Sequence, residues 1–539
     1  MKNLFSKRLL GTAVGAVLLA GSVSCTKDLD REPFYGLNTE SVYKDPQNIR
    51  DVLAKLYGGL VTTGRGTNND GATGNPDVKA DDEGASSYLR QLWVSQELPT
   101  DEAVIAWGDG AIQDLNTLKW SSNNNYNQLM YSRIFFQLTL CNEFIRETSD
   151  ENLNRRGISG QDLAKVQQYR AEARFLRALS YYHALDLFGN PPFVTEADTP
   201  GKFLPEQTDR PKLFAYVESE LKAVEAILPA PRQNEYGRAD KAAAWTLLSR
   251  LYLNAEVYIS QPRYNDAITY AKKVIDEGGY ALAPSYPNLF LADNNLTSKS
   301  EMIMAVINDG VRIRSFGGTT FLVHASIGGR MNPLDYGVKE GWGGLRATKN
   351  LPLLFGNVTQ SVPDKRALFF TPGQRLDINN LTSFNNGYAV TKWQNVTSDG
   401  KIGSDPGQTF ADTDFPLFRL ADVYLMYAEA TLRGGNGDQG KALQYVNALR
   451  QRAYGNTSGN VNTLTLDFLL DERARELYWE GYRRTDLIRF KKFTGSSYIW
   501  PWKGGQAAGD GVVMEERTLY PIPSSDLGAN PKLKQNPGY

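Results

Sequence analysis

Few groups in this 539-residue chain could catalyse a reaction. It holds only two histidines, His183 and His324, and it lacks an HExxH motif, a paired-cysteine zinc motif, a P-loop and a G-x-S-x-G turn. His183 lies in an apolar helical segment, where a structural histidine is the simpler interpretation. Sixty acidic residues leave open a carboxylate pair for glycoside hydrolysis. The sequence therefore offers no recognisable catalytic motif.

The most suggestive carboxylates are Glu472, Glu476 and Glu480 in the segment ERARELYWEGYRR. They alternate with basic residues at helical spacing, namely Arg473, Arg475, Arg483 and Arg484. Opposite charges three or four residues apart on a helix form ion pairs. We therefore predict ion pairs along this helix rather than catalysis.

Aromatic side chains are abundant, with 28 Tyr, 23 Phe and 9 Trp. Trp107 stands at the start of a Gly/Asp-rich loop, and Trp342 stands between Gly341 and Gly343. Such a ring can lie flat at the surface as a ligand platform, or it can plug its own loop onto the core, and the residues alone favour neither. Three other tryptophans lie among or beside apolar residues at helical spacing and are predicted to be core: Trp120, Trp245 and Trp479.

The N-terminus has the features of a secretion signal. Basic residues precede a short apolar stretch, Leu9–Ala20, which is too short to span a membrane. The sequence Ser22-Val23-Ser24-Cys25 resembles a bacterial lipobox, so residues 1–24 are predicted to be removed and Cys25 to be lipidated. The other cysteine, Cys141, has apolar neighbours and is predicted to be a buried, inert thiol.

The predicted mature chain, residues 25–539, is nearly neutral. Loss of Lys2, Lys7 and Arg8 leaves 56 basic residues against 60 acidic ones. A nucleic-acid-binding surface would need a basic excess, so nucleic acid is excluded as a general partner. After Cys25 no apolar run reaches membrane-spanning length.

Helical periodicity covers two large parts of the chain. Helices are predicted over 38–60, 126–146, 161–188, 212–228 and 466–490. Two helix pairs, 241–258 with 264–277 and 418–432 with 439–453, share the small-residue spacing of tetratricopeptide repeats, for example at Ala267 and Ala271. Each such pair needs neighbours to bury its open face.

Turn residues dominate the remainder. Residues 62–87 are rich in Gly, Asn and Asp, which is typical of an exposed loop. Between 278 and 415 we predict short strands at 302–307 and 319–323 and a helical stretch at 344–355. Irregular segments on a helical support are where loops carry out recognition.

Several long strings together resemble one family. They are AEARFLRALSYYHALDLFGNPPFV, GRADKAAAWTLLSRLYLNAEVY, FPLFRLADVYLMYAEA, ERARELYWEGYRRTDLIRF and YPIPSSDLGANPKLKQNPGY, and they are similar in order to the SusD/RagB family of glycan-binding surface lipoproteins. The resemblance implies a mostly α fold: four tetratricopeptide-like pairs form a scaffold (about 36–61, 124–277 and 416–495). It also implies loop-rich glycan-binding elements (about 62–123 and 278–415) and a C-terminal segment, 496–539.

The resemblance extends to the starch-binding member of that family. ELPTDEAVIAWGDG, DGVRIRSFGGTTFLV, EGWGG, KWQNVTSDGK and WPWKGG are the segments that carry it. It implies an aromatic arc at Trp107, Phe316 and Trp342, with polar sugar contacts at Arg90 and Asp82. Two positions depart from the pattern, because Phe316 replaces a tyrosine and Gly110 replaces an asparagine.

The same resemblance implies a structural calcium site, although no cofactor is required. Its ligands would come from Asp293, Asn295, Asp412 and Asp414, since calcium prefers oxygen ligands. Asn295 replaces an acid there, and turn-stabilising Asx residues would explain the same sequence.

The leading hypothesis is a non-catalytic receptor on the cell exterior, anchored in the outer membrane by lipid. It would bind starch or malto-oligosaccharides and deliver them to a SusC-type TonB-dependent transporter. One alternative is a similar receptor for another glycan, such as a β-glucan or an α-1,6-glucan. Another is a helical-repeat scaffold for protein interactions.

Overall fold

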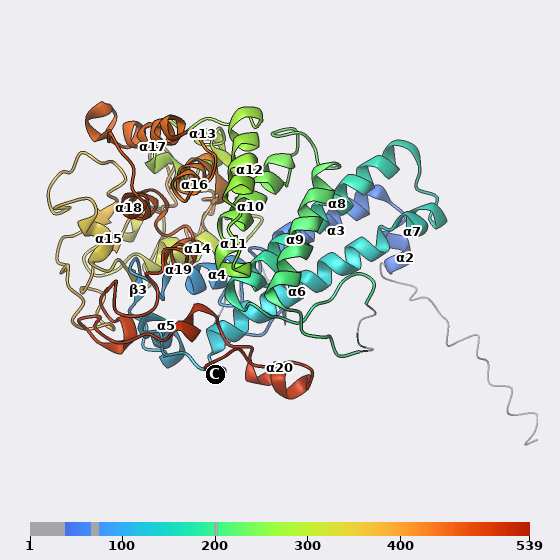
Figure 1. The fold of residues 1–539 in the computed structure, drawn as a ribbon, viewed down its shortest axis with the longest axis horizontal. Helices are drawn as coiled ribbons and strands as arrows, with labels where there is room; N and C mark the ends of the chain where they lie inside the picture. Colours follow the sequence, from blue (N-terminus) through green and yellow to red (C-terminus); the bar gives the residue numbers. More distant parts are fainter. Residues whose placement is uncertain (1–37, 66–74, 83, 199–200, 202) are drawn as a thin grey trace, which may run out of the picture.

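Long helices form most of the chain, as the computed structural model shows for residues 38–65, 75–82, 84–198, 201 and 203–539 (Figure 1). The longer helices are α3 (Pro46–Gly58), α4 (Tyr88–Glu97), α6 (Asn125–Glu147), α8 (Gly160–Leu187), α9 (Arg210–Glu225), α10 (Lys241–Leu253), α12 (Tyr264–Glu277), α16 (Leu420–Leu432), α17 (Gln439–Tyr454) and α18 (Leu466–Leu477). The shorter ones are α2 (Thr39–Val42), α5 (Gly110–Thr117), α7 (Asp150–Arg155), α11 (Ala255–Ile259), α13 (Asn294–Thr297), α14 (Gly318–Ala325), α15 (Asn350–Leu353), α19 (Arg483–Arg489) and α20 (Ser524–Ala529).

The strands are short and lie in four separate antiparallel pairs. They are β1 (Gly64–Arg65) with β2 (Asn75–Pro76), β3 (Val104–Ile105) with β5 (Leu345–Arg346), β4 (Met302–Val306) with β8 (Phe415–Arg419), and β6 (Phe369–Phe370) with β7 (Ala389–Val390). Short 3-10 turns occur at Pro287–Phe290, Pro333–Tyr336, Thr457–Gly459, Lys503–Gly505 and Glu515–Thr518.

The long helices pack in a continuous series. α6 packs on α8, α8 on α9, α9 on α10, α10 on α12, α12 on α16 and α16 on α17 (Figure 1). Both sequence-predicted pairs are present, and Ala267 and Ala271 are fully buried where α12 meets its neighbours. The mostly helical fold with a loop-rich part is thus confirmed, whereas the grouping into four tetratricopeptide-like pairs stays a prediction.

One strand prediction and three helix predictions need correction, each for a local reason. Residues 319–323 are not a strand: they lie in α14, whose residues are all buried, so no alternation reveals the backbone state. Residues 418–419 belong to β8, so α16 begins only at Leu420. The stretch 344–355 contains β5 and one short helix, α15. The helix predicted over 466–490 ends at Leu477, because Tyr478 has an extended ψ of 139° and Trp479 a positive φ of 62°, and α19 begins only at Arg483.

Two further predicted helices are interrupted by local capping. Pro46 begins α3 with Asp45 as its N-cap, which separates α3 from α2. Asn254 ends α10 and precedes α11, and its side-chain amide donates a hydrogen bond to the Arg250 carbonyl at 2.9 Å.

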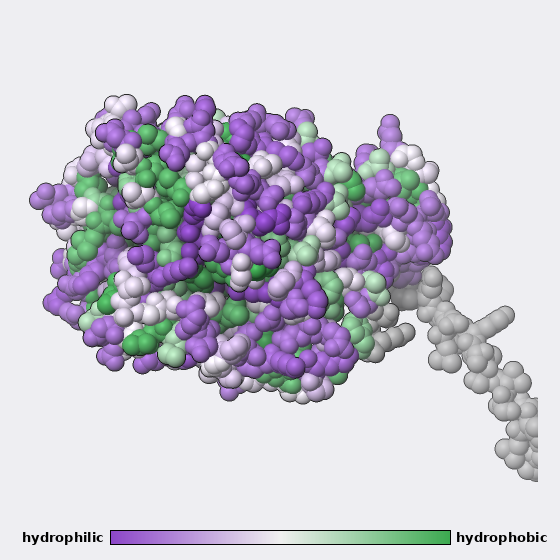
Figure 2. Space-filling model, in the orientation of Figure 1, coloured by the Kyte–Doolittle hydropathy of each residue, from purple (hydrophilic) through white to green (hydrophobic). Residues whose placement is uncertain are grey.

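The three tryptophans predicted to be core are confirmed, since Trp120, Trp245 and Trp479 are all buried. Cys141 is also buried, and burial raises the pKa of its thiol to about 12, which makes it inert at neutral pH. In the face shown in Figure 2, hydrophilic residues cover most of the surface, and apolar residues gather toward the side that carries α15 and α18.

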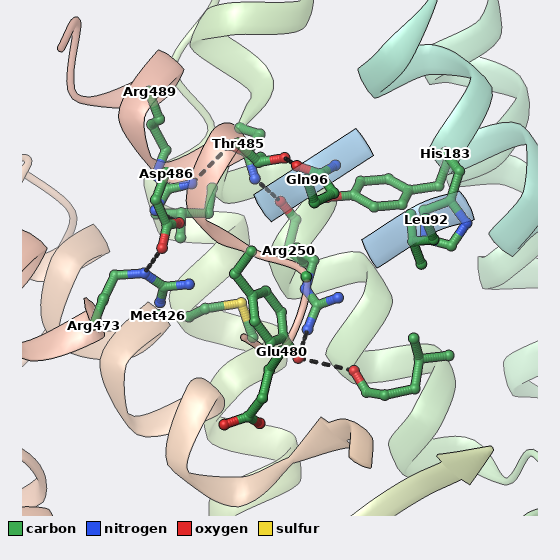
Figure 3. A pocket seen from close by; sticks show the side chains of 16 residues that line it. Leu92, Gln96, His183, Arg250, Met426, Arg473, Glu480, Thr485, Asp486 and Arg489 are labelled. Carbon is green, nitrogen blue, oxygen red and sulfur yellow. Dashed lines mark hydrogen bonds and ion pairs between the residues drawn. The ribbon is translucent and has the colours of Figure 1, made fainter. Parts of the chain in front are cut away.

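Polar side chains gather where α4, α8, α10 and α19 meet (Figure 3). They surround a cavity of about 30 Å³. His183 lies at its edge, and its Nδ1 is 2.7 Å from the Tyr88 hydroxyl, so its predicted structural role is confirmed. Arg473 donates to Asp486 at 2.7 Å, and Arg250 donates to Asp422 at 2.8 Å.

The Glu472, Glu476 and Glu480 carboxylates form ion pairs, as predicted, but mostly not along their own helix. All three are fully buried. Only one predicted pair, Glu472 with Arg475, joins positions three apart at 2.7 Å. The other partners come from distant segments: Arg366, Lys392, Arg419, Arg450 and Arg452. The carboxylates therefore tie α18 to the loop-rich part and to α17.

Candidate functional site

The two glycine-flanked tryptophans are brought together by one short ribbon. Trp107 follows β3 and Trp342 precedes β5, and these strands pair with Ile105 opposite Leu345. The Ala106 amide donates to the Gly344 carbonyl at 2.8 Å, which extends the ribbon toward both rings. The ring centroids lie 6.5 Å apart, and their planes differ by 46°.

Phe316 completes a continuous strip of three rings. It precedes α14, and its centroid lies 6.2 Å from that of Trp342 with a plane difference of 43°. All three side chains are half-buried, so each ring is held on one side and accessible on another. The structure therefore places side by side three residues that are up to 235 positions apart in the sequence.

The central ring rests on a histidine. His324 of α14 is fully buried and stacks under Trp342, with centroids 4.7 Å apart and planes 23° apart. Its Nε2 is 2.7 Å from the Thr409 carbonyl oxygen, which fixes the imidazole. Burial lowers the pKa of His324, so the ring stays neutral and flat beneath the indole. On the other flank, Phe410 supports Phe316 at 4.9 Å.

The glycines that follow Trp342 have different causes: Gly343 has a positive φ of 57° with open space around it, whereas Gly344 is required by close packing. The Trp107 Nε1 donates to the Trp342 carbonyl at 3.1 Å. A Cβ at Gly344 would lie 2.9 Å from the Trp107 ring, so a side chain there would displace the indole. The Gln113 amide also fixes this loop by donating to the Trp107 carbonyl at 2.6 Å.

The two predicted polar residues lie beside Trp107. Arg90, in the buried helix α4, is 2% exposed, and its Nη2 is 2.9 Å from Asp82 Oδ2. Its guanidinium carbon lies 5.6 Å from the centre of the Trp107 ring and 4.5 Å from that of Phe321. Burial lowers the pKa of Arg90, and the Asp82 carboxylate opposes that shift. Asp82 keeps most of its side chain in solvent and can accept hydrogen bonds from a ligand.

Three of the four residues proposed for calcium accept hydrogen bonds from the protein. Asp293 accepts hydrogen bonds from Ser398, Asp412 accepts them from Gly310 and Ser404, and Asp414 accepts one from the Asn308 amide. Asn295 is exposed. Within the described residues, no group of three or more His, Cys, Asp or Glu side chains is placed to hold a metal ion. Calcium binding by these residues stays a prediction.

Reasoning from residue types missed the supports of the strip: His324, Phe321 and Phe410. Their only signal was proximity in sequence to Phe316 or to Asp412, which does not reveal a stacking partner. Cys25 lies outside the described residues. No helix in the described part of the chain is long and apolar enough to cross a membrane.

A sugar chain presents flat C–H faces, which can stack on aromatic rings, and hydroxyls, which need hydrogen-bonding partners. The ring strip and the polar groups at its edge offer both kinds of contact. The helical fold and this surface define a glycan-binding protein. Two family models match the chain, "SusD family" over residues 339–539 and "Starch-binding associating with outer membrane" over residues 39–253. The chain belongs to the SusD family, whose members are non-catalytic glycan-binding proteins associated with the outer membrane.

One relative is similar over its whole length. "Starch-binding protein SusD" of Bacteroides thetaiotaomicron is 36% identical, with 100% of both chains covered. A "SusD-like protein" of Bacteroides ovatus is 23% identical over 76% of this chain and 80% of its own.

Solved structures share the fold. Surface glycan-binding protein A from Bacteroides fluxus aligns with a TM-score of 0.68 at 21% identity, covering 92% of this chain and 99% of its own. The Bacteroides thetaiotaomicron protein of that name, solved with laminarihexaose, aligns with a TM-score of 0.67 at 20% identity, covering 91% and 99%.

Proposed function

We propose that this protein binds starch-like α-glucan oligosaccharides on the cell exterior and delivers them to a SusC-type TonB-dependent transporter. The observation that carries the binding step is the strip formed by Phe316, Trp342 and Trp107. The 36% identity to a protein named for starch binding supports an α-glucan as the ligand.

The orientation of the rings favours a curved chain. Successive ring planes differ by 43° and 46°, so the three faces turn along the strip instead of lying in one plane. An α-1,4-glucan curves from residue to residue and can lay its sugar faces on such rings in sequence. An extended, flat chain would suit coplanar rings better.

Polar contacts would come from the edge beside Trp107. Asp82, two-thirds exposed, supplies acceptor oxygens for sugar hydroxyls, whereas Arg90 is 2% exposed and would act by holding Asp82 and the Trp107 ring in place. Because Gly110 has no side chain, this edge lacks one hydrogen bond that the family resemblance implies. The site therefore binds through ring stacking first and through few directional contacts.

Membrane attachment would come from Cys25. Its lipidation after removal of residues 1–24 would hold the protein at the outer membrane, in agreement with the description of the family model that matches residues 39–253. Delivery to a transporter can be tested by crosslinking on intact cells, where the expected product contains this chain and a TonB-dependent transporter.

The binding step is tested by calorimetry with maltoheptaose and by affinity electrophoresis in amylopectin. We expect a binding free energy of about −4 to −6 kcal/mol for the wild type. Trp107→Ala or Trp342→Ala should cost roughly 1–3 kcal/mol each. The matched control is Tyr445→Ala, which removes a half-buried ring from α17. Equal binding by all four proteins would overturn the proposal, and binding of laminarihexaose instead of maltoheptaose would change the ligand to a β-glucan.

A further inference from the structure

A second carboxylate, that of Asp109, lies two residues after Trp107 at the same edge of the ring strip. Asp109 is exposed and caps α5, with its Oδ1 accepting from the Ala111 amide at 2.9 Å. Its Oδ2 accepts from the Tyr126 hydroxyl at 3.0 Å. Tyr126 of α6 is 8% exposed, so it holds this carboxylate in one orientation. A Cβ at the neighbouring Gly110 would meet nothing within 4 Å, so the space beside Asp109 is open.

Four polar side chains near Trp107 form two hydrogen-bonded pairs, Arg90 with Asp82 and Tyr126 with Asp109. Arg90 and Asp82 are joined at 2.9 Å, and Tyr126 and Asp109 at 3.0 Å. The two pairs are close enough for the charges of Arg90 and Asp82 to affect the pKa of Tyr126. Burial and the Asp109 carboxylate raise the pKa of Tyr126, so its hydroxyl stays protonated and acts as a donor.

We propose that Asp109, held by Tyr126, is a further glycan-binding residue that accepts hydrogen bonds from sugar hydroxyls beside Trp107. This inference rests on the proposed function, because it assigns a specificity determinant to the same site. At this edge two carboxylates, Asp82 and Asp109, face one cation, Arg90, which leaves a net charge of −1. The site should therefore select neutral sugars over uronic acids and sulfated sugars.

The chemistry follows from the free lone pairs of the carboxylate. Each oxygen of a carboxylate can accept about two hydrogen bonds, and each Asp109 oxygen has one partner in the protein. One position on each oxygen remains for two neighbouring hydroxyls of a sugar. Hydrogen bonds to an ionised acceptor are about twice as strong as neutral ones. An anionic sugar would instead meet like charges at short range.

The test compares variants that separate binding from helix capping. Asp109→Ser removes the carboxylate but keeps a good N-cap residue, whereas Asp109→Ala removes both. We expect both variants to bind maltoheptaose about tenfold more weakly than the wild type, with only Asp109→Ala losing thermal stability. Asp276→Ala, at an exposed acid on α12, is the matched control and should leave the affinity unchanged.

A second measurement distinguishes a direct contact from a structural effect. The probes are maltosides that each lack one hydroxyl. For at least one of them, the missing hydroxyl should weaken binding to the wild type relative to maltose. The same hydroxyl should make no difference to Asp109→Ser, which has lost the carboxylate that would accept from it. The Asp109→Ser variant should also lose part of the preference for maltoheptaose over its C6-carboxylated form. If Asp109→Ser binds like the wild type while Trp107→Ala does not, the inference is wrong and the proposed function stands. If the wild type binds no α-glucan, the proposed function fails, and this inference fails with it.

Discussion

At the scale of single residues, the candidate site consists of three aromatic rings that neighbouring side chains hold in place at the surface. Resemblance to a known family predicted Trp107, Phe316 and Trp342, and the structure places them in one strip. Residue types alone could not choose between a platform and a loop plug, because a glycine-flanked tryptophan suits both. The structure shows that Trp342 does both, since it covers His324 with one face and stays half-exposed.

Phe316 gives the most direct test at this scale. Phe316→Tyr should hold or improve the affinity for maltoheptaose, because the added hydroxyl can bond to sugar for up to about 1.5 kcal/mol. Phe316→Leu should weaken binding by roughly 1–3 kcal/mol, since it keeps an apolar side chain but loses the ring. Calorimetry measures both, and melting curves check the fold. A loss in Phe316→Tyr as large as that in Phe316→Leu would contradict a glycan contact at this ring.

At the scale of elements, amphipathic helices were predictable and fully buried elements were not. α12 carries a clear apolar face and was predicted within its observed bounds. α14 and β8 are buried on every side, so the periodicity that separates helix from strand is absent. The partners of Glu476 were equally hidden, because Arg366 and Arg419 reach it from distant segments.

Glu476 tests the importance of that buried network. It contacts Arg366, Arg419 and Arg452, and although burial alone would raise the pKa of Glu476, these cations lower it. Glu476→Gln should reduce the free energy of unfolding by about 3–5 kcal/mol, since it leaves buried arginines without their partner. Asp276→Asn, at an exposed ion pair with Lys272, should change it by no more than about 0.5 kcal/mol. Urea unfolding of both variants measures the difference, and equal effects would argue against a structural network.

His183 gives the helical part a defined pH dependence. Burial lowers its pKa to about 3, from an ordinary value near 6.5. Between these two pH values the unfolded chain binds one more proton than the folded chain. The contribution of neutral His183 to the free energy of unfolding is therefore complete above pH 6.5 and is lost as the pH falls. The loss is about 1.4 kcal/mol per pH unit. Between pH 6.5 and 5.0, the free energy of unfolding should therefore fall by about 2 kcal/mol more for the wild type than for His183→Asn, as measured by urea unfolding. Parallel pH profiles would show that His183 is not the group responsible.

At the scale of the whole molecule, the helical series supports the fold and the loop-rich part carries the ring strip. Buried ion pairs hold the two parts together. The ring strip is built by β3, β5 and the start of α14, all outside the long helix pairs. α4 links the two, because Arg90 lies beside the rings while Gln96 reaches the polar centre of the helices at Asp186. Loops can therefore vary in sequence to change the glycan while the helices keep the fold.

The proposed anchoring of the whole molecule would depend on one side chain, that of Cys25. Cys25→Ser removes the thiol that would carry the lipid, and no described helix could replace the anchor by spanning a membrane. In a host that lacks the transporter, the variant should therefore move from the membrane fraction to the soluble fraction once residues 1–24 are cleaved. Cys141→Ser is the matched control: its thiol is buried in α6, so the protein should stay with the membrane. Protease treatment of intact cells then reports whether the wild type faces the exterior. Full membrane retention of processed Cys25→Ser would refute lipid anchoring at this residue, because neither a transporter nor a described spanning helix would remain to explain it.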